Sequence, residues 1–194
     1  GIAMLADGQF LSERYGRFED LQIDATVERI SPEEATPSEV LDSQGTGLIT
    51  RFMLPRFEGT LGKKPFRGGG NAELAGISPT FINMFFKGEA LPVQLPQLFV
   101  GTADVDLELR GRLQKDKGEV SLKPVVLGAL NIPKGDFDLP LGSVSGDNTG
   151  DGISLPFEYD LLLDLGQEFY VHALDSQVRA VGQLRLLSDQ GKPQ

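Results

Sequence analysis

Apolar and polar residues alternate with a period of two along much of the chain, which is the pattern of β-strands that bury one face and expose the other. The longest run spans residues 103–113, and shorter runs cover 20–28, 157–164 and 178–186. In the longest run the apolar side alternates with aspartate, glutamate and arginine. One face of many consecutive strands is therefore predicted to be apolar and the other charged.

Glycine- and proline-rich stretches separate these runs, since the chain holds 24 glycines and 12 prolines. Clusters at 31–43, 62–71, 115–118 and 142–152 predict loops. Residues 78–88 fit two interpretations equally well, a short capped helix or a buried strand. The chain is thus predicted to be a single all-β domain over residues 1–194, as a sandwich, a barrel or a β-solenoid.

Charge and composition exclude several functions. The formal net charge of −10 repels phosphate backbones, which argues against nucleic-acid binding. The chain has no cysteine, so thiolate chemistry and disulfides are excluded. No run of about 18 apolar residues predicts a membrane-spanning helix. The opening Gly-Ile-Ala-Met suggests that residues 1–4 are a cloning remnant or an internal cut, so the chain is interpreted as a fragment of a larger protein.

Candidate chemistry is sparse. Asp147, Thr149, Asp151 and Glu158 have the spacing of a calcium loop, but no amphipathic helix flanks them, and a solvated loop is the favoured interpretation. The single histidine, His172, is predicted on the outer face of its strand. We therefore expect no enzyme activity, no cofactor and no metal.

The basic cluster of Lys63, Lys64 and Arg67 precedes three glycines, yet it lacks the order of a phosphate-binding loop. A hairpin tip is the favoured interpretation of this segment.

Three segments resemble repeats of the TamB (translocation and assembly module) family within the AsmA-like superfamily. Residues 91–111 resemble its "LP-x-x-LP … dL-x-L-x-G" run, and 128–137 its "G-x-l-x-IP-x-G" unit. Residues 163–173 with 178–186 resemble its "L-x-lG-d-x-v-x-l-x-A … arl-x-G-x-L-x-l" stretch, with a departure at Asp175 and Ser176. The resemblance covers roughly the last 120 residues.

The resemblance implies an elongated curled sheet, a β-taco or half-pipe with an apolar concave face; a closed β-sandwich is the alternative. It also implies a periplasmic protein of the cell envelope, anchored in the inner membrane outside this fragment. Its partners would be phospholipid or another acyl-chain ligand, and an outer-membrane barrel protein like TamA. The implied role is phospholipid transport that supports outer-membrane biogenesis and protein secretion.

The alternation selects the residues that would line a lipid groove, and ordinary core packing is the competing interpretation of each. A second hypothesis is an interaction module that pairs its edge strands with a strand of a barrel protein or with the next repeat of the same parent protein. The groove candidates are Val105, Leu107, Leu109, Leu122, Leu130, Ile132, Tyr159, Leu161, Leu163, Phe169, Val171, Val178, Ala180, Leu184 and Leu186.

Overall fold

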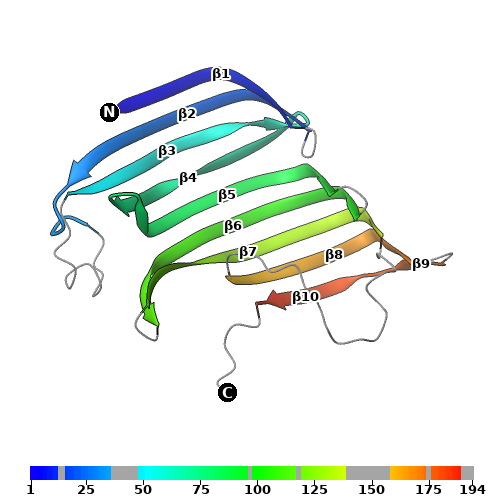
Figure 1. Cartoon of the computed structure of the whole chain (residues 1–194). Helices are drawn as coiled ribbons and strands as arrows, with labels where there is room; N and C mark the ends of the chain where they lie inside the picture. Colours follow the sequence, from blue (N-terminus) through cyan, green and yellow to red (C-terminus); the bar gives the residue numbers. More distant parts are fainter. Residues whose placement is uncertain are drawn as a thin grey trace.

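A computed structural model describes residues 1–12, 16–35, 48–95, 98–116, 119–138, 158–173 and 176–188, and these form one ten-stranded sheet (Figure 1). The described part contains no helix, so the predicted all-β fold is confirmed. Residues 78–88, which fitted helix or strand, belong to a strand. The strands are β1 (Ile2–Ser12), β2 (Gly16–Ile30), β3 (Ile49–Leu61), β4 (Lys64–Ala75), β5 (Ser78–Leu95), β6 (Phe99–Asp116), β7 (Glu119–Asp138), β8 (Glu158–Ala173), β9 (Ser176–Arg179) and β10 (Gly182–Leu187).

The strands follow one another across the sheet in the order β1 to β8 and then β10, with β9 also pairing with β8. Neighbours are antiparallel except β7 and β8, which run parallel. β1 and β10 are the two edges and lie far apart, so the sheet is a single open layer (Figure 1). The open, curled sheet agrees with the β-taco expectation, and the closed sandwich is wrong.

β-Bulges interrupt the ladder within most of the central strands and bend them. Register shifts fall between Gly88 and Leu91, between Thr102 and Asp104, and between Ile132 and Lys134. Ala90, inside the first of these, has a φ of 49°. A bulge kinks its strand and raises the local twist, so repeated bulges turn a flat sheet into a curved one.

Two clusters of buried apolar side chains share one face of the sheet, which we call the apolar face. A single layer has no second sheet to cover it, so burial on this face requires the sheet to curve toward it. The first cluster holds Leu21, Leu61, Phe66 and Leu91, and the second holds Phe99, Ala103, Ile132 and Phe169. The opposite face, which we call the polar face, carries most of the charged residues.

A third buried cluster lies beside the start of the β2–β3 connection. Glu73 is fully buried there and accepts hydrogen bonds from Arg51 at 2.9 and 3.0 Å. Arg51 also donates to the backbone oxygen of Glu34 at 2.7 Å. Ile49 is fully buried nearby and packs with Ile30 and Ala35. This network joins strands β3 and β4 to the 31–35 turn.

The loop predicted at 62–71 is wrong in its larger part. Only Gly62 and Lys63 form the turn, and the rest belongs to β4. Glycines 68–70 are in the strand because rings and backbone of β3 and β5 approach them closely; Gly70 has a φ of 142°. Glycine thus marks close packing here rather than a flexible tip, and Arg67 belongs to the strand too.

The other predicted loops are described only in part. In the predicted 115–118 loop, residues 115 and 116 belong to β6, so that prediction is wrong there, and residues 117 and 118 lie outside the described residues. Residues 31–35 form the described turn of the 31–43 segment. Residues 36–43 and the whole of 142–152 lie outside the described residues. Residues 2–4, interpreted as a possible cloning remnant, pair with β2 within β1.

Candidate apolar trough

Rows of apolar residues run across the strands of the C-terminal half of the sheet. Leu107 pairs with Gly128, which pairs with Leu161, which pairs in turn with Leu186. The neighbouring row is built in the same way, and it joins Val105, Leu130, Leu163 and Leu184. Because cross-strand partners share a face, these rows form a continuous aliphatic surface over β6, β7, β8 and β10. We call this surface the apolar trough.

The register places fourteen of the fifteen groove candidates on the apolar face, and the fifteenth, Ala180, packs against the Phe99 cluster there. Their exposure differs. Ile132 and Phe169 are 8% and 7% exposed and belong to the core. Leu184 is 51% exposed and Val178 61%. Leu122 lies on β7 beyond the point where β8 begins to pair. The remaining candidates are half-buried apart from Leu186, which is exposed, so the trough stays open to solvent.

One wall of the trough is an aromatic stack. Phe99 of β6 and Phe169 of β8 stack with ring centroids 6.1 Å apart, although β7 separates their strands. They meet because Gly135 of β7 lies between them, where a methyl group would come within 2.5 Å of the Phe99 ring. Gly135 therefore allows side chains two strands apart to touch and close one side of the trough.

The N-terminal half of the apolar face has a different lining, which the sequence analysis missed. Phe66 is 4% exposed, and the rings of Phe18, Phe57 and Phe86 lie 5.9, 5.3 and 5.4 Å from it between centroids. Phe66 was missed because residues 62–71 were predicted as a loop. Phe86 was missed because residues 78–88 fitted a helix as well as a strand. The alternation around Phe57 and the small residues Gly59 and Gly68 beside it could have signalled a ring-filled surface.

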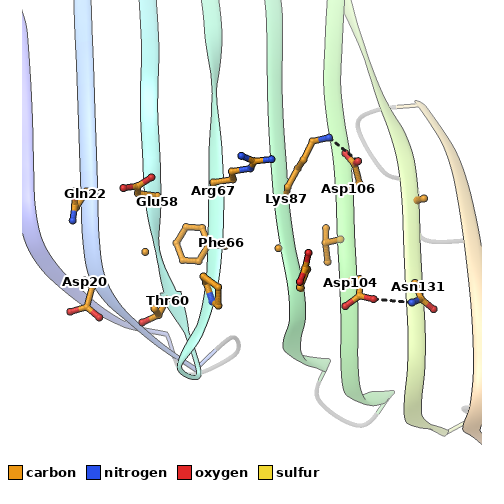
Figure 2. Close-up of a pocket in the computed structure, with 16 residues that line it drawn as sticks. Asp20, Gln22, Glu58, Thr60, Phe66, Arg67, Lys87, Asp104, Asp106 and Asn131 are labelled. Carbon is orange, nitrogen blue, oxygen red and sulfur yellow. Dashed lines mark hydrogen bonds and ion pairs between the residues drawn. The ribbon is translucent and has the colours of Figure 1, made fainter.

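A hollow of about 820 Å³ lies on the polar face across β2 to β7, and Figure 2 shows the side chains that line it. A twisted sheet curves in opposite senses along and across its strands, so each face is hollow in one direction. Two direct polar pairs lie in this hollow: Lys87 pairs with Asp106 at 2.8 Å, and Asn131 donates to Asp104 at 2.8 Å. The hollow has the character of a solvated scaffold surface.

Ion pairs hold neighbouring strands of the polar face together. Arg185 of β10 donates two hydrogen bonds to Asp160 of β8, at 2.8 and 2.7 Å. The hydrogen bond from the Arg185 guanidinium lowers the pKa of the Asp160 carboxyl, and the Arg185 pKa is raised in turn. His172 lies 2.9 Å from Asp136 on the same face, as predicted.

The described residues offer no cluster of three or more His, Asp or Glu side chains that could hold a metal ion. Of the calcium-loop candidates only Glu158, the first residue of β8, is described; Asp147, Thr149 and Asp151 lie outside the described residues. In the part of the chain that the structure covers, no helix is long and apolar enough to cross a membrane.

Comparisons with protein-family models, with curated proteins and with solved structures gave no match to this chain. The fold and the face chemistry define its class directly: a single-layer, open, curled β-sheet domain with one apolar and one charged face.

Proposed function

We propose that the apolar trough holds the acyl chains of a phospholipid, and that the domain is a non-catalytic part of a periplasmic protein that conducts lipid between inner and outer membranes. The observation that supports this best is the aliphatic surface over β6, β7, β8 and β10, which is half-exposed in an open sheet. Side chains that serve only as a hydrophobic core are normally covered by other parts of the protein and are not half-exposed. The envelope location rests on the TamB resemblance.

The physical chemistry of the trough suits acyl chains. Its rows carry no charged side chain between β6 and β10, so nothing in them demands a specific polar partner. Each methylene removed from water contributes about 0.8 kcal/mol. A continuous aliphatic floor exchanges one apolar contact for another as a chain slides, so movement along it meets a low barrier.

Native mass spectrometry with lipid extraction tests the proposal, together with photo-crosslinking from Leu107, Leu161 and Leu184. We expect co-purified phospholipid and crosslinks to its acyl chains. Leu161→Arg should abolish binding, because it places a charge in the middle of the trough, and Leu107→Arg should act in the same way.

The matched control is Leu162→Arg. Leu162 neighbours Leu161 on β8, is 41% exposed and lies on the polar face, so this variant should bind lipid as the unaltered protein does. Circular dichroism verifies that all variants keep the sheet. Lipid binding that survives in a folded Leu161→Arg protein would show that the trough is not the binding surface.

A second candidate function is pairing of an edge strand with a strand of an outer-membrane barrel protein. The exposed apolar side chains of the regular edge β10 favour it: Leu184 is 51% exposed and Leu187 58%. Crosslinking from β1 or β10 to a barrel strand would distinguish it from lipid binding.

A further inference from the structure

The two edges of the open sheet differ in how well they can accept another strand. β1 has two register shifts against β2, and Asp7, inside the first of them, has a φ of 55°. Bulges of this kind protect an edge against pairing. β10 pairs with β8 without any shift from Gly182 to Leu187, and each of its six residues is exposed. β10 is therefore the regular and unprotected edge.

The hydrogen-bond pattern fixes which backbone groups of β10 point outward. The Ser188 N–H donates to the Tyr159 backbone oxygen at 2.9 Å, so the backbone groups of Ser188 point toward β8. The backbone N–H and C=O groups of successive residues point to alternate sides of a strand, so those of residues 182, 184 and 186 also point toward β8. The N–H and C=O groups of Gln183, Arg185 and Leu187 then point away from the sheet, and no strand of the described residues lies beside them.

Side-chain chemistry makes this edge complementary to itself. In a two-fold symmetric antiparallel pair with Leu184 opposite its own mate, Gln183 lies opposite Arg185, and both present outward backbone groups. This register gives about four backbone hydrogen bonds at its centre. It also brings the two Leu184 side chains together on the apolar face. A shift by one pair in one direction would place Arg185 opposite Arg185, which like-charge repulsion disfavours. A shift in the other direction would place Gln183 opposite Gln183 and Leu184 opposite Gly182, and would lose the contact between the two Leu184 side chains.

We propose that two copies of this chain associate through β10 in this register, so that the two sheets and their apolar troughs become continuous. A two-fold interface uses the same surface twice and closes on itself, so it yields a dimer and not a fibre. The dimer covers Leu184, which is 51% exposed in the single chain. It depends on the edge alone and stands or falls independently of lipid binding.

Single cysteines test the register directly, because the chain contains none. Leu184 would form a non-hydrogen-bonded pair with its mate, in which Cα atoms approach to about 4.5 Å. Leu184→Cys should therefore form a disulfide-linked dimer under mild oxidation, since that distance suits a disulfide. Leu186→Cys, which faces Gly182 of the second copy, should remain largely uncrosslinked, and Leu5→Cys on β1 serves as the control for the other edge.

Sedimentation velocity of the unaltered chain provides the second measurement. Gln183→Pro removes an outward N–H without disturbing the pairing of β10 with β8, and should weaken dimerisation at least tenfold; Gln183→Ala is the side-chain control. A strictly monomeric chain would overturn the proposal, as would crosslinking at Leu186→Cys or Leu5→Cys in preference to Leu184→Cys. Phospholipid bound by a monomer would leave the trough function standing and remove only the dimer.

Discussion

The N-terminal and C-terminal halves of the apolar face are covered by different kinds of side chain. Over β2 to β5 the face is filled by rings that pack on Phe66, which is 4% exposed. Over β6 to β10 it also holds the buried Phe99–Phe169 stack, but the rows beside that stack are leucine and valine that stay half-exposed, with Leu184 at 51%. Both halves belong to one sheet with the same alternation, so alternation alone does not distinguish a core from a trough.

The size and spacing of side chains account for the difference. A ring beside a glycine reaches across to the next strand, as Phe66 does above Gly59. Aliphatic side chains set directly opposite one another cannot reach so far, and they leave a floor accessible from above. The aromatic half is therefore expected to carry the stability of the fold, and the aliphatic half to carry the binding.

Replacing the central ring should have the largest effect. Phe66→Ala removes a buried side chain that touches three other rings, so it should lower the free energy of unfolding by about 3–5 kcal/mol. Leu163→Ala, in the half-exposed trough, should cost only about 1–2 kcal/mol because less area is buried. Denaturant titration checks both; equal losses would contradict the division into halves.

Breaking the buried ion pair near the 31–35 turn should have the second-largest effect on the free energy of unfolding. Glu73→Ala leaves Arg51 without the carboxylate that accepts two of its hydrogen bonds. Breaking a buried pair costs about 3–5 kcal/mol, and the partial exposure of Arg51 reduces this to about 2–4 kcal/mol. Equilibrium unfolding measures the loss. The double variant Arg51→Met with Glu73→Leu should recover part of it, and failure to recover any would contradict the role assigned to the pair.

The wall of the trough should be sensitive to a single methyl group. Gly135→Ala places its Cβ 2.5 Å from the Phe99 ring and must push that ring away from Phe169. Overpacking of this kind costs about 1–3 kcal/mol. We expect a lower thermal midpoint and altered crosslinking near Phe169. Phe99→Leu in the same background should relieve the clash, and a lack of rescue would place the strain elsewhere.

The smallest expected effect is that of the exposed ion pair between Arg185 of the edge strand β10 and Asp160 of β8. The hydrogen bond from Arg185 lowers the Asp160 pKa, so this exposed pair stabilises the fold above the unfolded-state pKa of aspartate. The stabilisation is lost as pH falls through the lower folded-state pKa. An NMR titration of the Asp160 carboxyl should show a pKa that returns toward the ordinary value in Arg185→Gln. An unchanged value in that variant would contradict the assignment of the cause.

Particular residues show how far the sequence analysis reached. The alternation over 103–113 correctly placed Leu107 and Leu109 on one face and Asp106 and Glu108 on the other, because a strand has a strict period of two. It placed His172 correctly for the same reason. It failed at Gly68 and Gly70, because glycine composition does not distinguish a turn from a strand position where neighbours approach closely.

The sequence by itself determined the fold class and the face on which each groove candidate lies, since both follow from local periodicity and turn chemistry. Only the tertiary structure decided that the sheet stays open, that Ile132 and Phe169 belong to the core, and that β10 is the regular edge. These properties depend on strand order, bulge positions and contacts between strands far apart in the chain. Such contacts leave no periodic trace in the sequence.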